Sequence, residues 1–252
     1  MDTLIQRVAG HLEHAHRLLF VTGAGLSADS GLPTYRGIGG LYDGPNTDEL
    51  PIEVLLSGPM YQRDPSRTWK YISQLEAACR GAEPNRGHRV IANLETSFDV
   101  VVLTQNVDGL HHAAGSSRVI EIHGALRRLR CPACTWRDEV SDYAALEAVP
   151  RCPICEGIIR PDVVLFEEML PEVALDTWSE EANRGFDMVF SVGTSSLFPY
   201  IIEPVWMAAQ RGLPTVEINP ASTDLSSVVD VHLQLRAAEA LDALAKALGL
   251  DP

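Results

Sequence analysis

The chain has 252 residues, of which 46% are hydrophobic, so it can bury one large core or one core with a small satellite. Its formal net charge of −14 argues against a nucleic-acid-binding surface, which needs clustered Lys and Arg, and suits basic peptides better. No apolar run reaches the roughly 18 residues of a membrane span, and the N-terminus lacks the features of a signal peptide. We therefore predict a cytoplasmic protein that does not bind membranes.

The first predicted elements surround a glycine-rich turn. Residues 3–16 carry apolar side chains at helical spacing, which predicts a covering helix. In residues 18–37, a short apolar run ends in the turn, and the polar residues after it could open a helix. We expect Gly23 and Gly25 to let the backbone approach a pyrophosphate, and Ala28 to allow close helix–strand packing. The bare pattern Gly-x-Gly-x-x-Ala also fits an ordinary turn, so both interpretations stay open.

The next stretch changes in composition before the second strand. Residues 38–65 are rich in Gly, Pro, Asp and Asn, which predicts loops and short helices that could form a lid. Helical patterns follow at 69–80 and around 88–94. A β-branched strand at 98–104 then delivers the polar cluster 105–112 at its carboxyl end, which is where ligands bind in an open α/β sheet.

The remaining elements alternate between strands and helices. Strands are predicted at 119–122, 186–192, 214–218 and 231–235, and helices at 178–184, 202–211 and 238–248. This alternation predicts an α/β fold with a mostly parallel, doubly wound sheet.

Four of the five cysteines form two close pairs. Cys131 and Cys134 are separated by two residues, as are Cys152 and Cys155, and seventeen residues lie between the pairs. This spacing is typical of a zinc ribbon, in which four thiolates fill the coordination shell and leave no position for a substrate. We predict a structural zinc; the alternative is four reduced core cysteines. Cys79 lies outside the pattern and is interpreted as a buried helical thiol.

Together, these motifs resemble the sirtuin family of NAD-dependent protein lysine deacylases. The resemblance rests on Gly23-Ala24-Gly25 with Ser27, residues 33–37, Pro84-Asn85 with His88, residues 104–108 with His111, His123-Gly124, the four cysteines, residues 193–195 and Asn219. It implies a Rossmann-type NAD-binding domain of residues 1–37, 92–125 and 160–252. It further implies a small domain made of a helical insertion, 38–91, and a zinc ribbon, 126–159, with NAD and acylated lysine in the cleft between the domains.

The resemblance also implies a reaction and roles for its residues. The acyl oxygen attacks the NAD ribose as nicotinamide leaves, and water later releases free lysine and O-acyl-ADP-ribose. His123 matches the general base, and an imidazole with a pKa near 6.5 can accept a proton near neutral pH. Asn106 and Asp108 are expected to hold the nicotinamide amide and the ribose hydroxyls, and Arg36 lies near the reactive ribose. Without the family, His123 could be a core histidine, and Asn106 and Asp108 could be turn residues.

Binding residues are assigned by the same resemblance. For NAD they are Gly23, Ala24, Gly25, Ser27, Thr34, Tyr35, Arg36, Gln105, Asn106, Val107, Asp108, Gly193, Thr194, Ser195, Asn219 and Ala237. For the acyl-lysine peptide they are Val163, Val164, Leu165, Phe166 and Glu167. Tyr35 replaces the usual Phe and keeps the ring. Glu167 replaces the usual Gly, which could alter the backbone pairing with the peptide.

The sequence departs from the sirtuin pattern at two further places, and three alternative functions remain. Tyr61 and Tyr71 are followed three places on by Asp64 and Gln74, where members that remove succinyl groups carry Arg, so we predict poor desuccinylase activity. The order Pro199-Tyr200 reverses the family's pattern. A hydride-transfer dehydrogenase, a mono-ADP-ribosyltransferase and a non-catalytic NAD-sensing module remain as alternatives, and the oligomeric state is not predicted.

Overall fold

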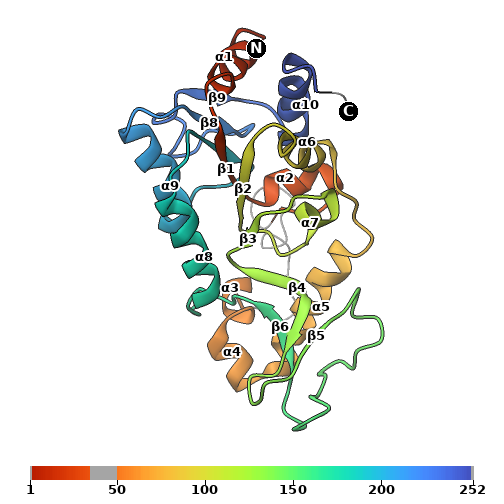
Figure 1. Cartoon of the computed structure of the whole chain (residues 1–252). Coiled ribbons are helices and arrows are strands. Elements are labelled where there is room, and N and C mark those ends of the chain that lie inside the picture. The colour runs from red at the N-terminus through yellow and green to blue at the C-terminus, as the bar shows by residue number, and fades with distance from the viewer. Residues whose placement is uncertain (1, 35–49, 251–252) are drawn as a thin grey trace.

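The computed structural model describes residues 2–34 and 50–250, and Figure 1 shows their arrangement. The helices are α1 (Asp2–Leu12), α2 (Ala24–Ser27), the 3₁₀ turn η1 (Ala28–Ser30), α3 (Ile52–Leu55), α4 (Gly58–Arg63), α5 (Pro65–Cys79), α6 (Arg86–Leu94), α7 (Leu110–Ala114), α8 (Glu172–Asn183), α9 (Pro199–Gln210) and α10 (Ala237–Ala247). The strands are β1 (Arg17–Thr22), β2 (Asp99–Thr104), β3 (Val119–Glu121), β4 (Gly124–Arg130), β5 (Arg137–Glu139), β6 (Arg160–Val163), β7 (Met188–Val192), β8 (Thr215–Ile218) and β9 (Val231–Leu233). None of the helices in these residues is both long and apolar enough to cross a membrane.

The main sheet has six parallel strands in the order β3-β2-β1-β7-β8-β9. β1 lies in the middle, pairing with β2 on one side and with β7 on the other. The strand order therefore reverses direction between β1 and β7, and in a doubly wound sheet such a reversal opens a crevice at the carboxyl ends of the strands.

Helices cover both faces of this sheet, which explains why residues 18–21 of β1 form a continuous apolar run. Leu18 and Phe20 pack into one hydrophobic cluster, with α1, α6 and α10. Leu19 and Val21 point to the other face and pack into a second cluster, with α8 and α9. Successive side chains of a strand alternate between faces, so a strand that is buried on both sides reads as a continuous apolar run.

A second, smaller sheet lies at the lower end of the molecule in Figure 1, beside α3, α4 and α5. Its three strands run antiparallel in the order β5-β4-β6. Trp69 and Tyr61 from the helices share one hydrophobic cluster with Leu129 and Cys131 from β4 and the residue after it. The helices and the small sheet are thus packed around a common core.

The α/β fold with a parallel sheet and a small sheet bearing the cysteines is confirmed, with differences in detail. The helix after the glycine-rich turn is one turn long, because α2 gives way to η1 and then to Gly31 in a left-handed conformation. The antiparallel pairing of β4 with β5 and β6 was not predicted, nor was α7. β6 contains Pro161 and two charged residues, so it lacks the alternating pattern of a strand.

Candidate functional site

The site is built where the loops after β1 and β7 meet. Gly25 N donates to Gly193 O at 2.7 Å, and Gly23 N donates to Val192 O at 3.0 Å. Gly193 has φ +60°, and a Cβ there would lie 2.4 Å from Leu26 N. A Cβ on Gly25 would lie 2.7 Å from Gly193 O. These glycines are therefore required by the packing of the two loops against each other, before any ligand is considered.

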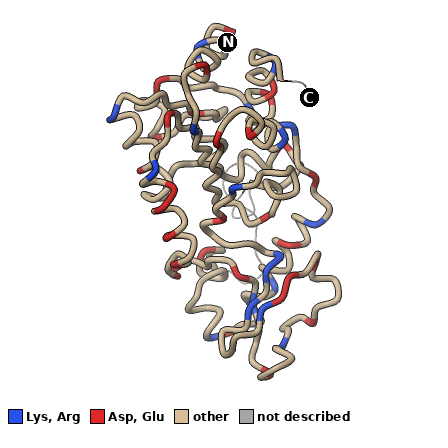
Figure 2. Tube along the Cα trace, in the orientation of Figure 1, with Lys and Arg blue, Asp and Glu red and all other residues tan. Residues whose placement is uncertain are grey.

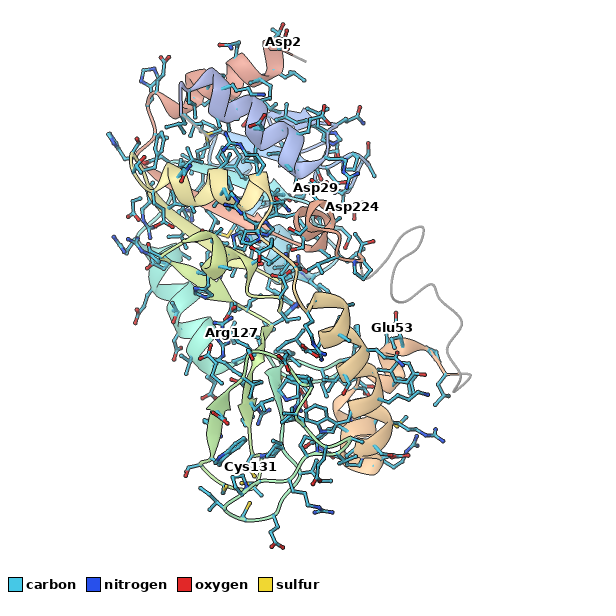
Figure 3. The ribbon with its side chains drawn as sticks, turned by 90° about the vertical axis from the view of Figure 1, so that its right-hand side faces the viewer. Asp2, Asp29, Glu53, Arg127, Cys131 and Asp224 are labelled. Atoms are coloured by element: carbon cyan, nitrogen blue, oxygen red, sulfur yellow. The ribbon has the colours of Figure 1, made fainter. Side chains whose placement is uncertain are left out.

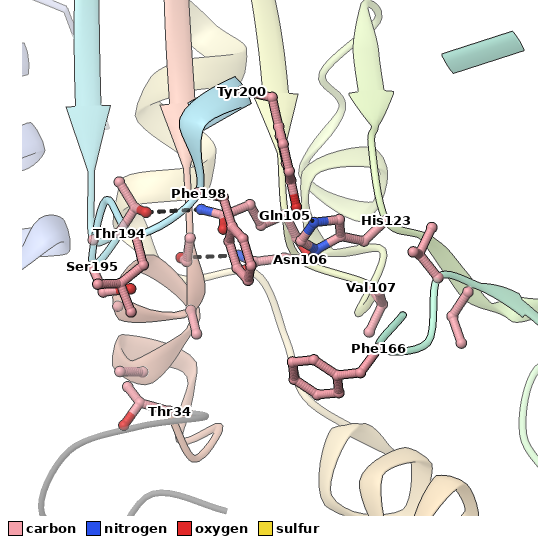
Figure 4. Close-up of a pocket in the computed structure, with 18 of the residues that line it drawn as sticks. Thr34, Gln105, Asn106, Val107, His123, Phe166, Thr194, Ser195, Phe198 and Tyr200 are labelled. Carbon is pink, nitrogen blue, oxygen red and sulfur yellow. Dashed lines mark hydrogen bonds between the residues drawn. The ribbon is translucent and has the colours of Figure 1, made fainter. Parts of the chain in front are cut away.

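A cleft of about 1010 Å³ opens beside these loops and gathers most of the predicted residues (Figure 4). Those that line it are Gly23, Ala24, Gly25, Thr34, Gln105, Asn106, Val107, His123, Val163, Val164, Leu165, Phe166, Glu167, Gly193, Thr194, Ser195 and Asn219. Ser27 and Asp108 instead line an adjoining cavity of about 20 Å³, which shares Ala24 and Asn106 with the cleft. Ala237 is buried and lines neither space, whereas its neighbour Arg236 lines the cleft. Tyr35 and Arg36 lie outside the described residues.

Asn106 carries an unsatisfied acceptor at the edge of the cleft. Its Nδ2 donates to Gly23 O at 3.0 Å and to Ser27 Oγ at 3.1 Å, which fixes the orientation of the amide because a carbonyl can only accept. The Oδ1 atom is buried and has no hydrogen-bond partner within the described residues. A buried acceptor without a partner is costly, so this atom is available to an N–H donor of a ligand, such as a carboxamide.

Asp108 and Ser27 are positioned by each other. Ser27 Oγ donates to Asp108 Oδ2 at 2.7 Å, and Leu110 N donates to Asp108 Oδ1 at 2.9 Å. Burial nevertheless raises the pKa of Asp108, because desolvation disfavours the carboxylate. The two residues form a polar wall that reaches the cleft through Asn106.

Side chains from three strand ends also hold the other end of the cleft. Gln105 Nε2 donates to Thr194 Oγ1 at 2.8 Å, and Asn219 Nδ2 donates to Thr194 O at 2.9 Å. Ser195 is exposed beside them. The loops after β2, β7 and β8 are therefore tied together at the switch point, where hydroxyl and backbone groups can meet phosphate or ribose oxygens.

His123 follows β3 and presents an unprotonated nitrogen. Its Nδ1 lies 3.1 Å from Gln105 O; a carbonyl accepts, so Nδ1 carries the hydrogen and Nε2 is the acceptor. Burial lowers the pKa of His123 to about 4, because desolvation disfavours the imidazolium and outweighs the bond to Gln105. The ring is therefore neutral near pH 7 and able to accept a proton.

The acceptor nitrogen of His123 is engaged by Tyr200, a residue outside the set assigned from the sequence. Tyr200 Oη lies 2.6 Å from His123 Nε2 (Figure 4). Burial raises the pKa of Tyr200 to about 12, so the phenol stays protonated and donates. Phe198 stacks on Tyr200 with ring centroids 5.5 Å apart. The reversed order Pro199-Tyr200 was the only signal in the sequence, and it places the aromatic ring at the start of α9, facing His123.

The segment 163–167 begins at the end of β6 and runs along the cleft next to His123. Val164 N donates to His123 O, and Phe166 N donates to Leu56 O, both at 2.9 Å. Gly124 makes this approach possible, since a Cβ at that position would lie 1.8 Å from Asp162 O. Glu167 has φ +65°, a conformation that glycine adopts easily. The backbone thus has a conformation that glycine would favour, although the residue is a glutamate.

The four cysteines form a separate cluster at the opposite end of the small sheet. Their Sγ atoms all lie within 4.8 Å of one another, with 3.4 Å between Cys131 and Cys155 and 3.6 Å between Cys134 and Cys152. A tetrahedral Zn²⁺ with bonds of about 2.3 Å places its thiolates about 3.8 Å apart, so the arrangement fits this ion. Figure 3 shows Cys131 far from Asp224, which lines the cleft. Four thiolates would leave no open position on a bound Zn²⁺, so this ion would be structural.

Buried histidines make the stability of the fold dependent on pH. Burial lowers the pKa of His88 to about 4 and that of His111 well below 6.5, as it does for His123. Between about pH 6.5 and pH 4 the unfolded chain binds these protons and the folded chain does not, so protonation favours unfolding. We expect the free energy of unfolding to fall by up to ~1.4 kcal/mol per pH unit for each histidine across this window.

Urea unfolding at about pH 7 and about pH 5 measures this dependence. His88→Gln should reduce the difference between the two pH values, whereas His14→Ala, at an exposed position, should leave it unchanged. Equal stability of the parent protein at both pH values would contradict the assignment of neutral, buried imidazoles.

Comparison with known proteins places these features in a family. The model of the Sir2 family matches residues 23–198. The NAD-dependent protein deacylase 2 of Pseudomonas syringae pv. tomato is 54% identical over 239 residues, which cover 93% of this chain and 96% of that protein. The crystal structure of a Sir2 homologue in complex with NAD superimposes with a TM-score of 0.87 at 34% identity, covering 98% of this chain and 95% of that one. A mutant Sir2 homologue in complex with 2′-O-acetyl ADP-ribose gives a TM-score of 0.86 at 35% identity, covering 100% and 98%.

Proposed function

Because the chain belongs to the Sir2 family, we propose that it removes acyl groups from protein lysines with NAD as co-substrate, releasing nicotinamide, O-acyl-ADP-ribose and free lysine. The observation that carries this proposal is the neutral His123 imidazole, whose acceptor nitrogen lies in the cleft beside the segment 163–167. When bound, NAD supplies the ribose carbon that the acyl oxygen attacks.

The chain's own residues have distinct tasks in this reaction. His123 accepts a hydroxyl proton at Nε2, and its bond to Gln105 keeps Nδ1 protonated throughout. Asn106 Oδ1 offers an acceptor to the carboxamide of the nicotinamide, and the loops at Gly23 and Gly193 hold the phosphates. Phe166 and Phe198 line the same cleft and help to keep water away from the reacting atoms. Ser27 and Asp108 act as a polar support behind Asn106.

The apolar wall of the cleft supports a preference for uncharged acyl groups. Leu56, Ile72 and Leu75 line it from the side of α3 and α5. Tyr61 does not line it, because its hydroxyl donates to Ile158 O at 3.1 Å in the core of the small domain. Among the described residues that line the cleft, Arg236 is the one Lys or Arg, and it pairs with Asp29. We expect acetyl-lysine peptides to be turned over faster than succinyl-lysine peptides.

The division of the chain into two domains is also part of the proposal. The shared hydrophobic core of α3, α4, α5 and the small sheet supports one small domain formed by both insertions. The boundary after residue 91 falls inside α6, whose Val90 and Ile91 pack with the large sheet. We therefore place the end of the helical insertion before α6. The cytoplasmic localisation of the protein stays a prediction.

We propose that the protein does not bind nucleic acids, because the arginines of β4 are paired with carboxylates. Figure 2 shows basic residues gathered on the small sheet. Arg127 and Arg128 of β4 both pair with Glu121, and Arg130 pairs with Asp162. Arginines that are held by neighbouring carboxylates offer little attraction to phosphates.

The decisive experiment incubates the protein with NAD and an acetyl-lysine peptide. Release of nicotinamide together with deacetylated peptide supports the proposal. Absorbance of reduced cofactor would indicate a dehydrogenase instead, and ADP-ribose attached to the peptide, detected by mass spectrometry, would indicate a transferase. Binding of NAD without turnover of the peptide would indicate a non-catalytic NAD-sensing module.

Tyr200 provides a finer test of how the base is used. Nε2 of His123 has one lone pair, which the phenol occupies, so an incoming ribose hydroxyl must displace Tyr200. A typical net hydrogen bond is worth ~0.5–1.5 kcal/mol, so Tyr200→Phe should lower the KM for NAD by about two- to tenfold without reducing kcat. Steady-state kinetics at saturating peptide measure both values. A lower kcat at unchanged KM would show instead that the phenol takes part in proton transfer.

A further inference from the structure

The candidate for a new role is Glu167, at the rim of the cleft. The segment 163–167 is fixed on both sides, by the bond from Val164 N to His123 O and by the bond from Gly58 N to Phe166 O at 2.9 Å. Glu167 therefore lies three residues after Val164, whose N–H is bonded to the backbone of His123, and it lines the cleft. A peptide that binds along the segment 163–167 therefore passes this residue.

The backbone at Glu167 is unfavourable for the residue that occupies it. With φ +65° it lies in the left-handed region, which glycine adopts without strain and glutamate does not. A glycine here would keep the same path of the chain at lower conformational cost. A glutamate side chain thus occupies this position although the backbone conformation there is unfavourable for it. This points to a role for the carboxylate itself.

The neighbouring Glu168, and not Glu167, makes the contacts that stabilise this segment. Glu168 binds the guanidinium of Arg160 with contacts of 2.5 and 2.9 Å and accepts from Leu165 N at 2.9 Å. Glu167 is exposed, and within residues 2–34 and 50–250 it has neither an ion pair nor a hydrogen bond. Of these two adjacent carboxylates, one stabilises the loop and the other is free for a partner.

We propose that Glu167 selects acyl-lysine peptides that carry Arg or Lys within two residues of the acylated lysine, an inference that rests on the proposed deacylase function. An extended peptide advances about 3.4 Å per residue, so a long basic side chain two places away can still reach a carboxylate at the rim. The guanidinium fork matches a carboxylate in geometry and charge. An acidic residue at the same place meets repulsion, so the selection has both an attractive and a repulsive part.

The test compares matched acetyl-lysine peptides that differ at one flanking position, which is Arg, Ala or Glu. Partly exposed ion pairs contribute modestly, so kcat/KM should be about two- to fivefold higher for the Arg peptide than for the Ala peptide, and lower still for the Glu peptide. The ratio should approach one as salt is added, because the pair is screened.

Two variants separate this role from the protein's overall negative charge. Glu167→Gln should reduce the Arg-to-Ala ratio to about one, whatever its absolute activity. Glu172→Gln makes the same change in charge at an exposed position in α8 and should keep the ratio. A ratio of one in the parent protein, or a ratio unchanged in Glu167→Gln, would overturn the inference.

Fluorescence anisotropy with the same peptides, labelled, distinguishes this inference from the deacylase proposal. Preferential binding of the Arg peptide that Glu167→Gln abolishes, without turnover of any peptide, would support the role of Glu167 and refute the deacylase function. Turnover of all three peptides at equal rates would support the deacylase function and refute the role of Glu167.

Discussion

His123→Ala is expected to reduce the turnover of an acetyl-lysine peptide by about 10²- to 10⁴-fold, the usual contribution of a general base. The reason is the state of the imidazole: Nδ1 is bound to Gln105 O, and the pKa of about 4 leaves Nε2 unprotonated near neutral pH. Alanine leaves the cleft without this acceptor. Release of nicotinamide and of deacetylated peptide, measured under saturating NAD, reports the loss.

The control for this variant is His14→Ala, which removes an exposed imidazole that does not line the cleft and should leave turnover unchanged. The parent enzyme should remain active as the pH is lowered toward about 5, since its base gains a proton only near the folded pKa of about 4. Turnover by His123→Ala at the rate of the parent protein would remove His123 from the mechanism.

Cys131→Ser is expected to remove the metal and most of the soluble protein. Cys131 is buried, and its sulfur belongs both to the four-cysteine cluster and to the hydrophobic core of the small domain. Structural zinc sites contribute apparent binding free energies of about 10–16 kcal/mol in isolated zinc fingers, which exceeds the stability of a typical domain. Metal analysis should find about one zinc per chain in the parent protein and much less in the variant.

Cys79→Ser is the matched control for the metal site. Cys79 lies at the end of α5, outside the four-cysteine cluster, so it is not a ligand, and burial raises the pKa of its thiol to about 12. This variant should keep its zinc. A stable, metal-free and active Cys131→Ser protein would contradict the structural role of the ion.

The sequence was most informative where the chemistry is local. The apolar runs inside β1 and β2 are buried on both faces, so each had to appear as an unbroken hydrophobic stretch. The cysteine spacing predicted the cluster because each pair of cysteines lies within four residues. Two such short segments can bind one ion with little dependence on the rest of the fold.

Features that depend on contacts between distant segments could not be predicted in this way. The bond between His123 and Tyr200 joins residues 77 positions apart. The crowding that requires glycine at position 25 comes from Gly193, after another strand. The left-handed conformation of Glu167 runs against the preference of its residue type, so this backbone conformation could not be predicted from the residue.

Strands β4 and β6 of the small sheet link the four-cysteine cluster to the cleft. β4 starts immediately after His123, and β6 runs directly into the segment 163–167, with Gly124 paired to Val163 at this end. At the other end the chain leaving β4 and the chain entering β6 carry the cysteines. A zinc ion bound by these cysteines would therefore hold together two strands whose opposite ends lead into His123 and the segment 163–167 of the cleft. Oxidation of the thiolates should then slow catalysis, although no cysteine of the cluster lines the cleft.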